Sequence, residues 1–557
     1  MLIADSAART AAATARTGRT EAGFVAVPNL TYRGAMDWLK GMNLRGTVLL
    51  AAATALASTG LVQVAPTVQA TPTVRPAAGP IAKADWAMIP MSKDADRDGV
   101  IDGDGGFPKA GALSLQPSAT FIGAGNFEAQ PHERLIDGSL SWYLDPAGYP
   151  VQLDACSSVG ARYAWTILSG GVPVLATQPR RIAKKTCRTQ VVLPEGDYTF
   201  RLAVTRAGRT ETVEIPANVR NILMVVLGDS YASGEGTPRN IDAWMRQASL
   251  FTDFAPYWDD DPCDRSAVSG PAQAALALER ATPKTSVTLV DVSCAGATVD
   301  AGVLGPQPGA RKSASQIEQV RRIIGDRGID VVSITVGGND VGFTSILTSC
   351  STRVDCPIQR ASSGPLAAYP TLQDGAQARL GTLPAAYARI AGCLGGSPCN
   401  LAGPGDDRAL TIAPGGAVFP TMYPDITRAA SGAPCTYLTM DAADFAWARS
   451  TLLVPNAPAT YPYRTTANKD VILTVPNGTL NSQIAATGNL GWRPVSGAWG
   501  ASGDSEIGHG VCAGSQAWVF GLTALQGFPS GSFHPNPRGQ EAIAKAITAA
   551  VTAALGL

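Results

Sequence analysis

The sequence predicts an α/β protein in which a parallel β-sheet forms the larger, C-terminal part and a small β-sandwich precedes it. An unbroken apolar run at 222–227, followed by largely apolar runs at 287–292 and 331–336, is typical of parallel strands buried on both faces. Between the last two runs, apolar residues recur at helical spacing, and strands that alternate with helices indicate a parallel sheet. Before residue 218, short alternating segments separated by turns are typical of a β-sandwich.

The composition fits a loop-rich globular chain without a dominant charge. Its 557 residues include 59 glycines and 40 prolines, 16% are charged, and 44 basic residues balance 44 acidic ones. A neutral balance argues against an electrostatic nucleic-acid binder and against a disordered, highly charged chain. The absence of a GxxxxGK[ST] loop, and of a GxGxxG motif opening a βαβ unit, disfavours nucleotide chemistry.

Residues 1–70 are interpreted as a leader and secretory signal. Residues 48–65 carry no charge, Lys40 and Arg45 precede them, and the small-residue sequence VQA follows at 68–70. This order is typical of a cleaved signal. A single membrane anchor is the alternative, because 18 apolar residues can just span a bilayer. We favour the cleaved signal, and therefore a secreted protein, because the stretch is weakly apolar and no basic segment follows it.

All ten cysteines lie after the signal, and an even number is what a secreted, disulfide-bonded protein requires. No C-x-x-C spacing occurs, which disfavours a zinc ribbon or a thioredoxin-type site. Sequence alone leaves the connectivity open. Pairing each cysteine with its neighbour along the chain predicts the bridges Cys156–Cys187, Cys263–Cys294, Cys350–Cys356, Cys393–Cys399 and Cys435–Cys512.

Residues 71–109 are expected to be a linker that contains a candidate calcium loop. Carboxylates at alternate positions with a glycine sixth suit a loop whose oxygens surround a hard cation. The run resembles the D-x-D-x-D-G loops of EF-hands, dockerins and thrombospondin type 3 repeats, but Gly105 stands where an EF-hand has its bidentate Glu. The alternatives are a structural calcium site and a solvated acidic turn. The candidate ligands are Asp94, Asp96, Asp98 and Asp102.

Residues 110–217 are expected to form the β-sandwich. The segments 162–167 and 198–204 alternate in the manner of half-buried strands. The sequence LPEGDY at 193–198, placed before a strand, loosely resembles PKD-like or Ig-like modules of secreted bacterial enzymes. That resemblance implies either contact with a surface or polymer, or a spacer role, and fold-level reasoning favours the spacer.

In the C-terminal part, 218–557, four short motifs lie where expected strands end or where the last helix begins. GDS at 228–230 follows the first apolar run, CAG at 294–296 the second, and GGN at 337–339 the third, while His534 lies just before the last helix. Ligands of open α/β sheets bind beyond the carboxyl ends of the strands. We therefore expect these motifs to converge on one site.

These residue types form a complete set for acyl transfer. The hydroxyl of Ser230 is a weak nucleophile that needs a neighbouring base, and His534 can accept its proton and return it to the leaving group. The backbone N–H groups of Ser230 and Gly296 and the side-chain amide of Asn339 are candidate donors to an oxyanion. Each residue also has an ordinary alternative, such as a helix cap, a turn or a surface position, and their joint occurrence favours catalysis.

The order Ser230, Gly296, Asn339 and His534 resembles the four blocks of the SGNH, or GDSL-type, esterases and lipases. GDSYASGEG at 228–236 and VGGNDVGF at 336–343 carry the resemblance, and GHGVC at 508–512 resembles a segment of secreted actinobacterial members. The resemblance implies a flavodoxin-like parallel-sheet fold and hydrolysis of carboxylic esters, often of acyl lipids, without a cofactor for catalysis. We expect a monomer that acts on a small-molecule or lipid ester and binds no nucleic acid.

One position departs from the family pattern. Many members have an Asp three residues before the histidine, where this chain has Gly531. Some members use a Ser–His dyad oriented by a backbone carbonyl, which Gly531 could supply, although a carbonyl carries no full negative charge. A carboxylate from the long insertion, such as Asp504, is the alternative. Among the other histidines, His509 is interpreted as structural and His132 belongs to the N-terminal module.

Residues 344–530 are expected to be an irregular insertion over the sheet. The resulting hypothesis is a secreted serine hydrolase of carboxylic esters. Two alternatives stay open at this point. One is a carbohydrate acetyl esterase, which would prefer acetate over longer acyl groups. The other is a non-catalytic surface-adhesion protein that binds through its β module.

Overall fold

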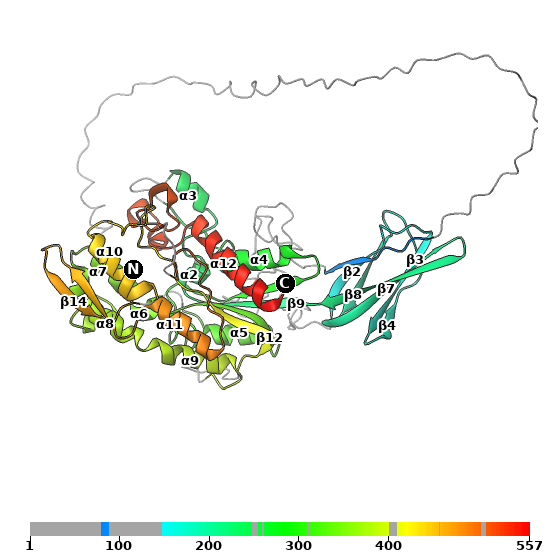
Figure 1. The fold of residues 1–557 in the computed structure, drawn as a ribbon, viewed down its shortest axis with the longest axis horizontal. Coiled ribbons are helices and arrows are strands. Elements are labelled where there is room, and N and C mark those ends of the chain that lie inside the picture. Colours follow the sequence, from blue (N-terminus) through cyan, green and yellow to red (C-terminus); the bar gives the residue numbers. More distant parts are fainter. Residues whose placement is uncertain are drawn as a thin grey trace, which may run out of the picture. The chain divides into compact units, whose positions relative to one another are not determined.

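The computed structural model describes residues 80–88, 148–247, 254–258, 261–309, 312–399, 409–455, 457–502 and 508–557 (Figure 1). The expected signal, the candidate calcium ligands (Asp94, Asp96, Asp98 and Asp102), His132 and Asp504 lie outside the described residues. In the described part of the chain, none of the helices combines the length and the apolarity that crossing a bilayer requires.

Two antiparallel sheets precede the parallel one. The first has the order β1-β2-β6, and the second has the order β4-β3-β7-β8, with β5 also paired to β3. The strands of the first are β1 (Asp85–Met88), β2 (Tyr149–Asp154) and β6 (Arg188–Leu193). Those of the second are β3 (Arg162–Ser169), β4 (Val172–Ala176), β5 (Arg180–Arg181), β7 (Gly196–Arg206) and β8 (Arg209–Val219).

Alternating side chains from both antiparallel sheets form one apolar core. Tyr163, Trp165 and Ile167 of β3 are buried, as expected of a strand with one face toward the core. They belong to the same cluster as Val151 and Leu153 of β2. Strand β1 lies in the segment that we expected to be linker, and this expectation is wrong for 85–88, because Trp86 and Met88 join that core through pairing with β2.

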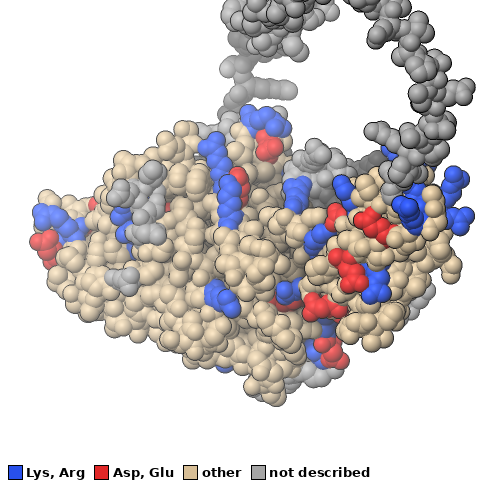
Figure 2. All heavy atoms as spheres, turned by 45° about the vertical axis from the view of Figure 1, so that its right-hand side comes forward, with Lys and Arg blue, Asp and Glu red and all other residues tan. Residues whose placement is uncertain are grey.

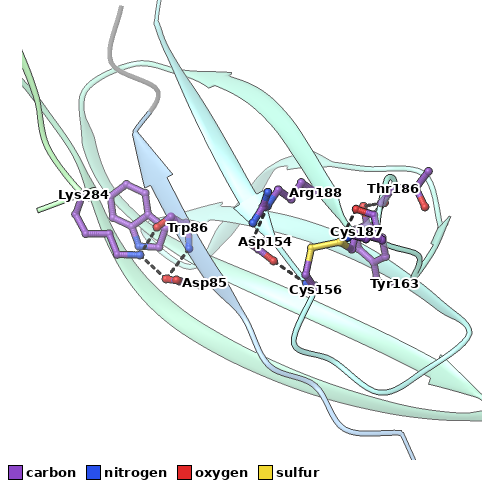
Figure 3. Close-up of polar contacts among 10 residues, drawn as sticks. Asp85, Trp86, Asp154, Cys156, Tyr163, Thr186, Cys187, Arg188 and Lys284 are labelled. Atoms are coloured by element: carbon purple, nitrogen blue, oxygen red, sulfur yellow. Dashed lines mark hydrogen bonds and ion pairs between the residues drawn. A yellow bond between two sulfur atoms is a disulfide. The ribbon is translucent and has the colours of Figure 1, made fainter. Parts of the chain in front are cut away.

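Polar contacts fasten the first antiparallel sheet at the row where Asp85, Asp154 and Arg188 lie opposite one another across its three strands (Figure 3). The Cys156–Cys187 disulfide lies beside the ion pair between Asp154 and Arg188, whose atoms are 2.8 Å apart. On β1, the ammonium group of Lys284 contacts the carboxylate of Asp85 and lies 4.8 Å from the centre of the Trp86 ring. Lys284 comes from the segment that leads into the parallel sheet.

The parallel sheet has the order β10-β9-β11-β12. Its strands are β9 (Asn221–Gly228), β10 (Ser286–Asp291), β11 (Ile329–Thr335) and β12 (Ile412–Pro420). Every residue of β9 and β10 is buried, which confirms the expected parallel strands at the three apolar runs. The expectation that 344–530 only covers the sheet is wrong, because β12 is a strand of the sheet itself.

Helices flank this sheet on both sides. In Figure 1, α4 and α12 lie side by side on one side, and α5 and α9 lie on the other. The helices are α2 (Ser230–Ser233), α3 (Ile241–Gln247), α4 (Gly270–Ala281), α5 (Gln316–Ile324), α6 (Gly338–Val341), α7 (Phe343–Cys350), α8 (Leu372–Leu380), α9 (Leu383–Leu394), α10 (Ala442–Trp447), α11 (Leu480–Ala486) and α12 (Pro537–Leu555). A hairpin of β13 (Thr460–Arg464) and β14 (Asp470–Thr474) lies between α10 and α11 in the chain.

The predicted helices have the expected local features. Ile317, Val320 and Ile323 are buried on α5, so their helical spacing marks the face toward the sheet. Helix α12 begins with Pro537, where a missing N–H costs nothing, and the side chain of Asn536 accepts hydrogen bonds from the first turn.

The five disulfides are those expected from neighbour pairing, which is thereby confirmed. Cys156–Cys187, Cys263–Cys294, Cys350–Cys356, Cys393–Cys399 and Cys435–Cys512 are all formed. Five bridges are typical of proteins that fold in oxidising compartments. Figure 2 shows that charged side chains cover only a small part of the face in view, in keeping with the charged fraction of 16%.

Candidate active site

The carboxyl ends of β9, β10 and β11 bring three of the predicted motifs to one edge of the sheet. The backbone N–H of Asp229 donates to the carbonyl of Thr335 over 2.8 Å, and that of Cys294 donates to the carbonyl of Gly228 over 3.0 Å. The side-chain amide of Asn339 donates to the carbonyl of Ala297 over 3.0 Å. The structure therefore brings together the loops that carry Ser230, Gly296 and Asn339.

Ser230 is the first residue of the short helix α2 and does not cap it. The cap is Asp229, whose carboxylate accepts a hydrogen bond from the backbone N–H of Tyr231 over 3.0 Å. A Cβ on Gly228 would lie 2.0 Å from the carbonyl oxygen of Thr335, so glycine allows the chain to turn this sharply out of the strand. The helix-cap alternative for the Ser230 hydroxyl is therefore wrong.

The three candidate oxyanion donors have N–H groups to offer. Among the hydrogen bonds of the described residues, neither the backbone N–H of Ser230 nor that of Gly296 is used as a donor. Gly296 has φ +81°, a conformation that glycine adopts without strain. Because an amide nitrogen carries two N–H groups, the bond from Asn339 to Ala297 leaves a second one for a ligand.

His534 lies beside the turn that follows Ser230. Its ring centre is 5.5 Å from that of Tyr231, and its Nε2 atom lies 3.3 Å from Oε2 of Glu235. A Cβ on Gly236 would lie 2.1 Å from the carbonyl oxygen of Pro535, so glycine at 236 allows the two segments to approach this closely. His534 is thus packed against the turn that follows Ser230.

Glu235 is a candidate functional residue that the sequence analysis missed. Its backbone N–H donates to the carbonyl of Ser230 over 3.1 Å, which ties it to the helix that begins with the serine. Its side chain and that of His534 are only 12% and 13% exposed, so solvent screens their interaction weakly. Glu235 belongs to the GDSYASGEG motif, but the motif does not reveal where its side chain points.

Gly531 contacts His534 through the backbone. The carbonyl of Gly531 accepts a hydrogen bond from the backbone N–H of His534 over 3.2 Å. This bond shapes the turn that leads to the histidine. The prediction that the same carbonyl orients the imidazole ring stays a prediction.

A buried network joins the Ser230 loop to the Asn339 loop. The hydroxyl of Tyr423 donates to the carboxylate of Asp229 and accepts a hydrogen bond from the backbone N–H of Gly338 over 3.0 Å. Burial raises the pKa of Asp229 to about 7, an effect that its hydrogen bonds with Tyr423 and Tyr231 oppose. Burial likewise raises the pKa of Asp340 to about 6.

An apolar cavity of about 90 Å³ lies next to these loops. Three of its lining residues, Tyr231, Gly338 and Phe533, are the sequence neighbours of Ser230, Asn339 and His534. The rest of its lining is mostly apolar and includes Val341, Phe343, Ile346, Leu347, Leu452 and Leu453.

The other described histidine has a structural environment. The ring of His509 stacks on Trp518 with 3.6 Å between ring centres, and its Nδ1 lies 2.8 Å from the carbonyl oxygen of Gln516. His534 is therefore the candidate base within the described residues. Those residues hold no group of three or more His, Cys, Asp or Glu side chains arranged for a metal ion.

Comparisons with known proteins identify no family. No family model matches the chain, and no curated protein matches it. Among solved structures, a "putative arylesterase" from Agrobacterium tumefaciens str. C58 is 10% identical to this chain, with a TM-score of 0.25. The alignment covers 59% of this chain and 97% of the arylesterase chain. A carbohydrate esterase whose active site displays divergent catalytic and non-catalytic binding functions is 8% identical, with a TM-score of 0.16. That alignment covers 61% of this chain and 79% of the carbohydrate esterase chain. At these TM-scores the two likenesses carry no argument about this chain.

Proposed function

We propose that this chain is a secreted serine hydrolase of the SGNH type that cleaves carboxylic esters with apolar acyl groups. The observation that carries the proposal is the convergence of the Ser230, Gly296 and Asn339 loops at one sheet edge, with His534 packed against the Ser230 turn. Strand ends of parallel sheets are where such folds bind ligands. The five disulfides support the secreted part of the proposal.

In the proposed reaction, the Oγ atom of Ser230 attacks the ester carbonyl while its proton passes to Nε2 of His534. The backbone N–H groups of Ser230 and Gly296 and the amide of Asn339 donate to the oxyanion of the tetrahedral intermediate. Collapse of the intermediate breaks the C–O bond, and the leaving alkoxide takes the proton from Nε2. Water then attacks the acyl-enzyme by the same route, which releases the carboxylic acid and returns the proton to Ser230.

The carboxylate of Glu235 is proposed to stabilise the imidazolium that forms in both halves of this reaction. The imidazolium carries its positive charge 3.3 Å from Oε2 of Glu235, and both side chains are largely buried. A nearby opposite charge favours the charged form of a titratable group. Because this contact is made to Nε2, the atom that accepts the Ser230 proton, Glu235 would act through its negative charge and not by orienting the ring through the other nitrogen. Proton transfer from Ser230 requires its Oγ atom to come within hydrogen-bond distance of Nε2 of His534. Contacts between catalytic groups are often long in an unliganded site and shorten when substrate binds.

The cavity favours an acyl group longer than acetate. An acetyl group has a single methyl to bury, whereas the cavity is lined largely by aliphatic and aromatic side chains. Each buried CH₂ group contributes about 0.8 kcal/mol, which corresponds to about a fourfold gain in kcat/KM where the transition state keeps the contact. This observation supports a lipid-like ester over an acetylated carbohydrate as the substrate.

The decisive experiment compares the wild type with Ser230→Ala. The wild type should hydrolyse p-nitrophenyl acyl esters and should be labelled on Ser230 by an active-serine phosphonate, mapped by mass spectrometry. Ser230→Ala should lose at least about 10⁴-fold in kcat and all labelling while its circular dichroism is unchanged. Ser397→Ala, at an exposed position outside the site, is the control that keeps both. Normal turnover by Ser230→Ala, or an unlabelled and inactive wild type, would overturn the proposal and favour a non-catalytic adhesion protein.

A further inference from the structure

Strand β4 is apolar along its whole length and exposed along its whole length. Its sequence is VPVLA, and all five residues are exposed, with Val172 at 63%, Val174 at 54% and Leu175 at 38%. No residue of β4 belongs to the apolar core that the antiparallel sheets share. Strands with one solvated face normally alternate apolar and polar residues. This strand therefore offers apolar surface that the described fold does not use.

The same strand is poorly suited to pairing with another strand. It lies at the edge of its sheet, where an unpaired backbone could template such an addition. Pro173 has no N–H to donate, however, and the register with β3 shifts so that Val174 is an extra, bulged residue. Proline and bulges are devices that block strand addition at sheet edges. A partner would therefore contact β4 through its exposed side chains and not through backbone hydrogen bonds.

A dense group of cations follows β4 on the same edge. Strand β5 pairs with β3 as β4 does, and Arg181 lies opposite Arg162 in that pairing. Between Asp154 and Glu195 the chain has six basic residues and no acidic one. Of these six, Arg188 pairs with Asp154. The other five are all exposed and form no ion pair with any described residue: Arg162, Arg180, Arg181, Lys184 and Lys185.

We propose that the β4–β5 edge is a docking surface for a lipid bilayer that contains anionic headgroups. Basic residues beside an anionic bilayer each strengthen binding by about fivefold, and apolar side chains add to this by entering the boundary between headgroups and acyl chains. Both features are present side by side on one sheet edge. The proposal rests on this edge alone, so it can succeed or fail independently of the proposed esterase activity.

Two other occupants fit the edge less well. A second copy of this chain would bring the cations of both edges close together, where like charges repel, and the proline and bulge of β4 disfavour strand pairing. A soluble anionic polymer would use the cations but would leave Val172, Val174 and Leu175 exposed to water. A bilayer with anionic headgroups complements both the charge and the apolar surface.

The experiment measures sedimentation of the full chain with vesicles. A Ser230→Ala background is used so that no lipid is consumed, and the vesicles contain either phosphatidylcholine alone or phosphatidylcholine with 25% phosphatidylglycerol. The cation variant is Arg180→Gln, Arg181→Gln, Lys184→Gln and Lys185→Gln, and the apolar variant is Val172→Thr, Val174→Thr and Leu175→Thr. Threonine keeps the strand preference of valine. The matched control removes four exposed cations elsewhere: Arg464→Gln, Lys469→Gln, Arg493→Gln and Lys545→Gln.

We expect binding to the anionic vesicles that weakens with added salt, and at least tenfold weaker binding to phosphatidylcholine alone. The cation variant should bind the anionic vesicles at least tenfold more weakly, the apolar variant at least fivefold more weakly, and the control as the parent does. An apolar variant that binds like the parent, with equal binding of dextran sulfate, would overturn the proposal in favour of a polyanion site. No binding by the parent, or equal loss in the control, would also overturn it, and a concentration-dependent dimer would identify a second copy instead.

Discussion

Glu235 and His534 are far apart in the sequence, yet Nε2 of the histidine lies 3.3 Å from Oε2 of the glutamate. The glutamate belongs to the same turn as Ser230, and its backbone N–H donates to the serine carbonyl. In this arrangement the proposed nucleophile and the carboxylate beside the proposed base come from one continuous segment of six residues, 230–235. Of Ser230, Glu235 and His534, only the histidine comes from a distant part of the chain.

Replacing Glu235 by Gln should lower kcat/KM for p-nitrophenyl esters by roughly tenfold to a hundredfold, because an opposite charge beside a titratable group shifts its pKa by about 1–3 units and one unit corresponds to about tenfold. The imidazolium would lose its neighbouring negative charge, so its protonated form would be less favoured. The acidic limb of the pH–rate profile should therefore move to lower pH. Steady-state kinetics between pH 4 and 9 measure both effects. Glu235→Asp should keep the position of the limb, and an unmoved limb in Glu235→Gln would contradict the role.

Filling the cavity should change the acyl-length preference. Ile346→Trp adds a large side chain to the lining, so esters of long acyl chains should lose at least tenfold in kcat/KM while acetate esters change less than threefold. A series of p-nitrophenyl esters from acetate to palmitate measures this. Leu490→Trp introduces the same residue at an exposed position as a control. An equal loss for all chain lengths would indicate a general packing defect, which costs roughly 1–3 kcal/mol for an overfilled core.

Asp229 should make the protein less stable as pH rises. Because burial raises its pKa in the folded state from 3.8 to about 7, the folded state holds more protons than the unfolded state between about pH 4 and pH 7. The free energy of unfolding therefore falls across this window, by roughly 4 kcal/mol at most if about 1.4 kcal/mol corresponds to one pKa unit. Urea titrations at pH 5 and pH 8 should give a smaller difference for Asp229→Asn than for the wild type. Asp374→Asn, at an exposed position, should keep the full difference.

Removing the Cys263–Cys294 bridge should affect catalysis as well as stability. Cys294 lies two residues before Gly296, and the backbone N–H of Ala295 donates to the carbonyl of Cys263 over 3.1 Å. The Cys263→Ser/Cys294→Ser variant should lose roughly 2–4 kcal/mol of unfolding free energy and should also show a lower kcat at temperatures where it is fully folded. Cys393→Ser/Cys399→Ser is the matched control, because it removes a bridge outside the site. Equal kcat values for the two variants would contradict a role in holding the Gly296 loop.

The parallel sheet and the Ser230, Gly296 and Asn339 loops could be predicted because their physical requirements are local. A strand covered on both faces needs an unbroken apolar run, as in β9, and a sharp turn after it needs glycine, as at Gly228. Neighbour pairing of the cysteines succeeded for a related reason in four of the five bridges, whose cysteines are at most 31 residues apart, because a short loop costs less entropy to close.

The features that sequence reasoning missed depend on contacts between distant segments. Strand β12 contains Pro414, Gly415 and Gly416, so it lacks an apolar run, and a Cβ on Gly416 would lie 2.7 Å from the carbonyl oxygen of Ile329 on β11. Gly416 thus interrupts the apolar pattern of β12 and at the same time allows β12 to lie against β11. Glu235 escaped notice because the direction of its side chain becomes meaningful only once His534 is beside it. The cavity likewise forms between segments that are remote in sequence.

The bridge between Cys263 and Cys294 has a consequence for when the protein becomes active. A newly made chain in a thiol-rich cell interior has not formed this bond, so the loop that offers the Gly296 N–H is untethered at the moment of synthesis. In a secreted protein, formation of the Cys263–Cys294 disulfide after export would then fix this loop in place. For the proposed secreted hydrolase, this order of events predicts low activity until the Cys263–Cys294 bond has formed.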